Sequence, residues 1–152
     1  MNQATAQAKA EMLIRKPAAE VFEAFVNPEI TTQFWFTRSS GRLEAGKQVT
    51  WTWEMFNASS HVRVKAVEPN RRIVIEWSDP PTIVEWVFTA RDDGTTFISI
   101  TNSGFQGTDD EIVQQIVGST EGFTIVLCAL KALLEHNLQL KAVADRFPDG
   151  IG

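Results

Sequence analysis

Four of the five tryptophans alternate with aliphatic residues along three short segments of the chain. The segments are 49–53, 73–77 and 84–88, and in each of them bulky apolar residues stand two positions apart. Side chains two apart on a β-strand point to the same face of a sheet. The pattern therefore predicts a sheet face with little charge, whose aromatic members are Trp51, Trp53, Trp77, Trp86 and Phe88.

A long helical segment is expected after that sheet, over residues 119 to about 146. Phe123, Leu127, Leu130 and Leu134 form one line along it at α-helical spacing. The sheet and the helix each have one apolar side to bury, so the helix must cover the concave face of a curved sheet. An aromatic sheet face closed by one helix suggests a protein that holds an apolar molecule.

The rest of the pattern predicts one strand over 8–15 and two short helices over 18–26 and 28–36. Further strands are expected near 38–43, 47–55, 58–68, 71–78, 82–91 and 95–103. Turn residues separate these strands, and their regular spacing favours consecutive antiparallel pairing. Residues 104–118 are expected to form a connection with one helical turn over 109–117. The fold class is thus α+β, with a curved antiparallel sheet of six to seven strands.

The composition is typical of one soluble domain. The chain has 152 residues, and we expect a single domain over 1–152 with its core at about 10–146. A net charge of −5 argues against a general binder of nucleic acids or anionic membranes, which needs a basic face. The single cysteine, Cys128, fits a reducing compartment. The first ten residues lack the apolar core of a signal peptide, so we expect a cytoplasmic protein.

Two asparagines fall on the predicted apolar faces. Asn102 shares a strand face with Ile98 and Ile100. Asn137 lies within about 40° of the centre of the apolar stripe on the long helix. A buried amide without a partner costs about 1–3 kcal/mol. Each asparagine therefore either bonds to nearby backbone or faces the cavity and orients a ligand, and the spacing leaves both interpretations open.

The ionisable residues of the predicted sheet fall on its outer face. His61 alternates with inward-facing valines, and Glu54, Glu76 and Glu85 alternate with the tryptophans. These carboxylates are expected to pair across strands with the basic residues of the 58–68 strand. A catalytic carboxylate would need a bulge that changes the register.

The chain lacks the short motifs that bind nucleotides or metals or activate a serine. It contains no GxGxxG, no Walker-type glycine loop, no GxSxG and no HExxH. His136 lies opposite the helix stripe, and the acidic residues 109–111 are interpreted as a helix cap rather than as metal ligands. The sequence therefore predicts no cofactor, no metal site and no catalytic set.

Several short motifs follow one another in a characteristic order over about residues 10–140. They are PAAEVFEAF (17–25), WF (35–36), GRLEAG (41–46), VEPNRRI (67–73), EW (76–77), DGT (93–95), SGF (103–105), GF (122–123) and LKALLE (130–135). Together they resemble the START/Bet v 1-like (SRPBCC) superfamily, and most closely its branch of heat-shock-chaperone ATPase activators. Two positions depart from the family pattern: Phe123 stands where a tryptophan is frequent, and Asn102 where a histidine is frequent.

This resemblance implies a helix-grip fold with a cavity between the sheet and the long helix. It implies no shared reaction, because members include ligand carriers, stress-related proteins, chaperone activators and a few enzymes.

The leading hypothesis is that the protein binds a hydrophobic or aromatic small molecule between the sheet and the last helix. Ligand access is expected near the 104–118 connection and the second helix. The candidate ligand-binding residues are Trp35, Trp51, Trp53, Trp77, Trp86, Phe88, Asn102, Phe105, Phe123, Leu127 and Asn137. A chaperone-activating interaction module and an enzyme of the cyclase or hydrolase type are the alternatives. We expect a monomer or a homodimer.

Overall fold

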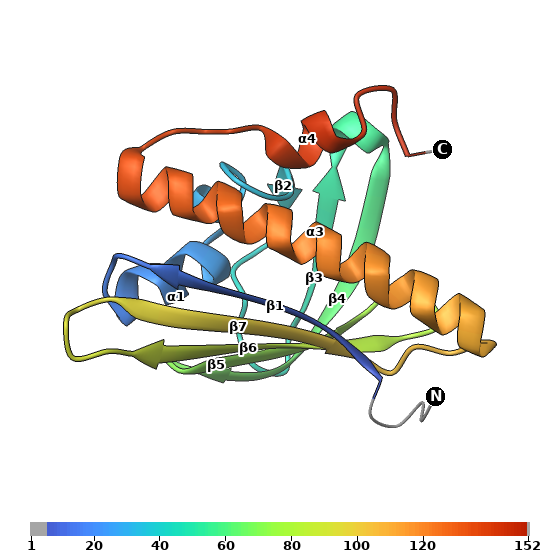
Figure 1. Ribbon diagram of the computed structural model, residues 1–152, viewed down its shortest axis with the longest axis horizontal. Coiled ribbons are helices and arrows are strands. Elements are labelled where there is room, and N and C mark those ends of the chain that lie inside the picture. The colour runs from blue at the N-terminus through green and yellow to red at the C-terminus, as the bar shows by residue number, and fades with distance from the viewer. Residues whose placement is uncertain (1–5, 152) are drawn as a thin grey trace.

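A seven-stranded antiparallel sheet curves around the helices in the computed structural model, which describes residues 6–151 (Figure 1). The strand order is β1-β7-β6-β5-β4-β3-β2, so the meander pairs consecutively and β1 closes against β7. The strands are β1 Gln7–Ile14, β2 Arg38–Ser39, β3 Gln48–Trp53, β4 Ala58–Glu68, β5 Arg72–Trp77, β6 Thr82–Ala90 and β7 Thr96–Ser103. The predicted α+β helix-grip architecture is confirmed.

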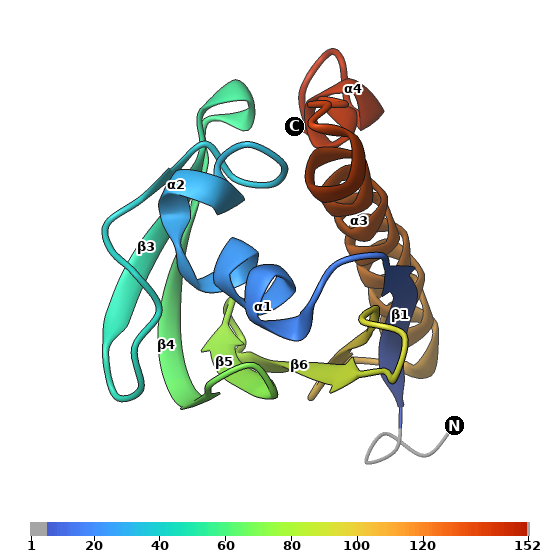
Figure 2. The ribbon, with the colours of Figure 1, turned by 90° about the vertical axis from the view of Figure 1, so that its left-hand side faces the viewer.

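Helices occupy the concave side of the sheet. They are α1 Ala18–Val26, α2 Pro28–Thr31, α3 Asp109–His136 and α4 Ala142–Arg146, while the 3-10 turn η1 Glu54–Phe56 connects β3 to β4. Figure 2 shows α1 and α2 in the space between the β3–β4 side of the sheet and α3. The inward face of α1 contributes Val21, Phe22 and Phe25 to the core. The interior of the grip is therefore filled by two short helices as well as by the long one.

The strand register places the tryptophans on the concave face, as predicted. Trp86 on β6 lies between Ile73 of β5 and Ile100 of β7, and all three are almost fully buried. Such directly opposed pairs are the units that stabilise a sheet. Trp51 is equally buried on β3, whereas Trp53 and Trp77 are half-buried.

The outer face of the sheet carries the expected ion pairs, with partly different partners. Glu76 pairs with Arg63 across β4 and β5 at 2.6 Å, as predicted. Glu85 pairs with Arg72 of β5, and Glu54 with Arg38 of β2, so neither uses a basic residue of β4. His61 is exposed, with its Nδ1 3.2 Å from the hydroxyl oxygen of the neighbouring Thr50.

The predicted bounds of the long helix are wrong at both ends. The helix begins at Asp109, because Thr108 forms a capping box: its Oγ1 accepts from Glu111 N, and Glu111 Oε1 accepts from Thr108 N. It ends at His136, because Asn137 adopts a left-handed conformation with φ of 53°. The last residues predicted for this helix, 142–146, form a separate short helix, α4.

The predicted helix over 28–36 also ends early. The α2 helix stops at Thr31, and residues 32–37 form a turn before β2. This turn points three consecutive rings, those of Phe34, Trp35 and Phe36, into the core. Three consecutive residues of a helix could not all face the core, so the irregular segment buries more aromatic surface there than a helix would.

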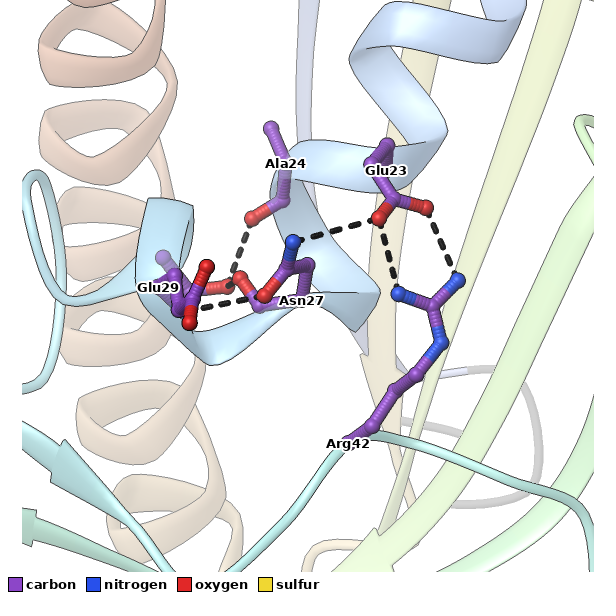
Figure 3. Close-up of polar contacts among 6 residues, drawn as sticks. Glu23, Ala24, Asn27, Glu29 and Arg42 are labelled. Atoms are coloured by element: carbon purple, nitrogen blue, oxygen red, sulfur yellow. Dashed lines mark hydrogen bonds and ion pairs between the residues drawn. The ribbon is translucent and has the colours of Figure 1, made fainter.

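A bidentate ion pair joins α1 to the loop before β3 (Figure 3). Both carboxylate oxygens of Glu23 accept from the Arg42 guanidinium at 2.8 Å, and Asn27 Nδ2 donates to Glu23 Oε2 at 3.2 Å. Asn27 Oδ1 in turn accepts from Glu29 N and caps α2. The hydrogen bonds from Arg42 lower the pKa of Glu23 below its ordinary value.

By length and composition, α3 is apolar enough to cross a membrane. An 18-residue window in it has a mean hydropathy of 1.5, and 33% of that window is buried. Its inward stripe, which includes Phe123, Leu127 and Leu130, packs into the core above the sheet. The central helix of a globular domain passes the same composition test.

Candidate functional site

A pocket of about 430 Å³ opens where the β5–β6 turn, the middle of α3 and α4 meet. Its exposed lining residues, which include Asp79, Glu121 and Phe147, mark its mouth. The full lining is Trp35, Phe56, Trp77, Ser78, Asp79, Pro80, Thr82, Asn102, Phe105, Gln115, Gly118, Ser119, Glu121, Gly122, Phe123, Ile125, Val126, Val143, Arg146 and Phe147. The cavity expected between the sheet and the long helix thus lies beside residues 115–126 of α3.

Two glycines on α3 leave the space for this pocket. Gly118 and Gly122 stand one turn apart on the helix face that lines it. A Cβ atom built on either glycine would meet no atom within 4 Å. A glycine inside a helix costs roughly 0.5–1 kcal/mol relative to alanine. The chain thus carries two unfavourable helix residues where larger side chains would reduce the pocket volume.

Asn102 is the buried polar residue of the pocket wall. Its Nδ2 donates to Thr82 Oγ1 at 3.0 Å and to Ile83 O at 2.9 Å. Its Oδ1 accepts from Ser119 Oγ of α3 at 2.9 Å. The amide therefore bonds to backbone and also lines the cavity, which combines the two interpretations of this position. Because both amide N–H groups are used, the neighbouring hydroxyls are the polar groups left for a ligand.

Charged side chains stand at the rim of the pocket. Arg146 Nε of α4 donates to Glu121 Oε1 of α3 at 2.7 Å, which ties the short helix to the long one. The same guanidinium lies 4.4 Å from the centroid of the Phe147 ring, within cation–π range. Asp79, in the β5–β6 turn, is exposed. These groups surround an aromatic interior with a mixed polar edge.

One cluster of aromatic rings forms the inner wall and the core behind it. Trp35 is its centre, because its ring lies within 4.9–6.3 Å of seven other rings: Phe25, Phe36, Trp51, Trp53, Trp77, Trp86 and Phe123. Tilted and edge-to-face pairs at such distances are favourable. Trp35 thus faces the pocket on one side and the packed core on the other.

The eleven predicted ligand-binding residues divide into three groups. Five line the pocket: Trp35, Trp77, Asn102, Phe105 and Phe123. Five lie in the core outside the pocket lining: Trp51, Trp53, Trp86, Phe88 and Leu127. Asn137 was placed wrongly, because it is the exposed C-cap of α3 and not a residue of its apolar stripe.

Sequence reasoning missed the residues that close the pocket from outside. Ser78 and Asp79 belong to a segment predicted only as a turn, and Val143 and Phe147 belong to a segment predicted as continuous helix or tail. Residues 104–118 were predicted as a connection but are mostly helix, since α3 begins at Asp109. Phe105, Gln115 and Gly118 of this segment do line the pocket, near which ligand access was expected. The Thr108–Glu111 spacing was a readable signal for the true start of α3.

The family model described as "Activator of Hsp90 ATPase homolog 1-like protein" matches residues 15–135. No functionally curated protein matches significantly. The protein SSP2350 from Staphylococcus saprophyticus has a similar solved structure, with 33% identity and a TM-score of 0.77 over 88% of this chain and 95% of that one.

More distant solved structures share the fold. The Aha1 dimer from Colwellia psychrerythraea has 15% identity and a TM-score of 0.73, covering 86% of this chain and 96% of that one. CalU16 from Micromonospora echinospora has 18% identity and a TM-score of 0.68, covering 90% of this chain and 80% of that one. With its family model spanning most of the sequence and its helix-grip fold, the chain belongs to the activator-of-Hsp90-ATPase-homolog-1-like family of the SRPBCC superfamily.

Proposed function

We propose that the protein binds a hydrophobic or aromatic small molecule in the pocket between the sheet, α3 and α4. The observation that carries this proposal is a space of about 430 Å³ with aromatic walls from six separate parts of the chain. Small-molecule sites have volumes of about 300–1,000 Å³ and combine apolar walls with a few placed polar groups. The aromatic walls here are Trp35, Phe56, Trp77, Phe105, Phe123 and Phe147.

Affinity would come mainly from removing apolar surface from water, at about 25 cal/mol per Å². The hydroxyls of Ser119 and Thr82, oriented by Asn102, offer the polar contacts of the inner pocket. The ion pair between Arg146 and Glu121 holds α4 over the mouth. A flat ring system with one or two polar substituents has the shape and chemistry that such walls accept.

Titration of tryptophan fluorescence against flavonoid, sterol and fatty-acid probes tests this function. Two tryptophans, Trp35 and Trp77, line the pocket, so a bound ring should change the emission and the change should saturate. The Gly122→Leu variant fills the empty space beside α3 and should weaken binding by at least about tenfold.

The Thr124→Leu variant is the matched control. It adds a similar side chain to the same helix at an exposed position outside the pocket lining. It should bind like the wild type. Equal affinities of the wild type and of Gly122→Leu would overturn the proposed site.

A second candidate, a chaperone-activating interaction module, is favoured by the family match over residues 15–135. In that case a surface of the domain would contact a heat-shock chaperone, and the pocket would be incidental. Adding the purified protein to a chaperone ATPase assay tests it: faster ATP turnover would support this role. Unchanged turnover at saturating protein would count against it.

A further inference from the structure

The indole nitrogen of Trp86 has no hydrogen-bond partner. Within residues 6–151, it is the one buried side-chain nitrogen or oxygen atom for which this holds. Trp86 is 1% exposed and lies on the concave face of β6. Asn102, on the same face, satisfies all its polar atoms. Buried polar groups in native proteins are nearly always paired, so an unpaired N–H requires an explanation.

Trp86 lies directly behind the inner wall of the pocket. Its ring centroid is 6.2 Å from that of Trp35 and 6.3 Å from that of Phe123, and both of those rings line the pocket. One layer of aromatic side chains therefore separates Trp86 from the pocket space. Trp35 belongs to the irregular turn 32–37 rather than to a helix or strand.

We infer that a pocket ligand reaches past this wall and accepts a hydrogen bond from Trp86 Nε1. This inference rests on the proposed function, and it names the class of ligand. The indole N–H is only a donor, so the ligand must present an acceptor at its inner end. A single neutral N–H cannot compensate for burying a carboxylate, which favours an uncharged oxygen such as a ketone, an ester or an ether.

Two probes of matched shape separate this contact from general apolar binding. They are 2-acetylnaphthalene, which has a ketone oxygen, and 2-isopropenylnaphthalene, which has a methylene group in its place. The ketone should bind about three- to tenfold more tightly, which is the usual net effect of one hydrogen bond. In ¹H–¹⁵N spectra, the indole proton of Trp86 should move downfield with the ketone and should not do so with the hydrocarbon.

The Trp86→Phe variant assigns that resonance and removes the donor while keeping an aromatic ring. It should abolish the preference for the ketone and change the affinity for the hydrocarbon little. Trp51→Phe is the matched control, because Trp51 is also 1% exposed and also lies outside the pocket lining, but its indole nitrogen is not a buried atom without a partner. This variant should keep the preference.

The outcomes distinguish this inference from the function on which it rests. If both probes bind and the Trp86 resonance is unchanged, or moves equally with both, the inference is overturned and the pocket remains a binding site. An equal shift would report the naphthalene ring that both probes share rather than a hydrogen bond. If neither probe changes any indole resonance or binds measurably, the proposed function fails for aromatic ligands and this inference fails with it.

Discussion

Asn102 of β7 bonds to two other elements: its amide donates two hydrogen bonds to the adjacent β6 and accepts one from Ser119 of α3. The residue is 4% exposed, so water has little access to the groups that bond to its amide. Its position on the sheet was predictable from the alternation of β7. Its connection to α3 was not, because that helix was expected to begin at Ser119 rather than ten residues earlier.

We expect the Asn102→Ala variant to lower the free energy of unfolding by about 1–3 kcal/mol, because three hydrogen bonds are lost at a buried site. The Ser119→Ala variant removes only one of those bonds and should cost about 1 kcal/mol or less. Urea denaturation of both variants measures the difference. Equal costs for the two variants would show that the contacts to β6 contribute nothing.

Replacing Gly122 is expected to stabilise the protein, unlike the substitutions at Asn102 and Ser119. Replacing it with alanine removes the conformational cost of a helical glycine, and the added Cβ meets no atom within 4 Å. The free energy of unfolding should rise by about 0.5–1 kcal/mol. Thermal unfolding followed by circular dichroism measures it. Destabilisation by this small substitution would contradict the empty space described beside α3.

At the scale of elements, the start of α3 depends on the capping box at Thr108. The Thr108→Ala variant should lower the free energy of unfolding by about 1 kcal/mol, since a backbone N–H of the first turn loses its acceptor. Hydrogen exchange should become faster over residues 111–118. A helix that began at Ser119, as the sequence suggested, would show neither effect.

The link between α1 and the loop before β3 should depend on pH. Because the pKa of Glu23 is lowered in the folded state, its contribution to stability is present above the unfolded-state pKa of about 4.3. It is lost as the pH falls through the lower, folded-state value. Both partners are substantially exposed, so we expect about 0.5–1 kcal/mol at pH 7.

Urea denaturation of the wild type and of Glu23→Gln, at pH 7 and near pH 3, measures the contribution of Glu23 to the free energy of unfolding. The difference between the two proteins should be largest at pH 7 and should shrink in acid. The Glu20→Gln variant is the control on the same helix, because Glu20 reaches its basic neighbour, Lys16, only at 3.9 Å. A constant difference between wild type and Glu23→Gln at both pH values would contradict the assignment.

At the scale of the whole molecule, α4 closes the pocket and packs against the core through one partly buried residue, Val143. None of its residues is fully buried, but Val143, Arg146 and the following Phe147 line the pocket. A chain that ends after Gln139 should keep its cooperative unfolding and lose no more than about 1 kcal/mol of stability. Its affinity for an aromatic probe should fall by about tenfold, because one apolar wall is gone. Loss of cooperative folding would show that α4 belongs to the core.

Features that depend on local sequence were predictable, and features that depend on tertiary contacts were not. Local pattern determined α1 and β4, whose predicted bounds match the structure, and strand alternation placed the tryptophans on one face. The ends of α3 were missed because Gly118 resembles a loop signal and the apolar spacing continues past Asn137. The pocket was misplaced because the β5–β6 turn, α3 and α4 meet only in the tertiary structure.

The contact of Trp35 with each of the other four indoles has an optical consequence. The ring centroids lie 4.9 Å apart for Trp35 and Trp51, and 6.0–6.2 Å apart for Trp35 and each of the other three. At such separations, electronic excitation passes between chromophores much faster than light is emitted. Excitation is therefore shared among the five indoles, and a quencher in contact with any one of them should reduce the tryptophan fluorescence of the whole protein.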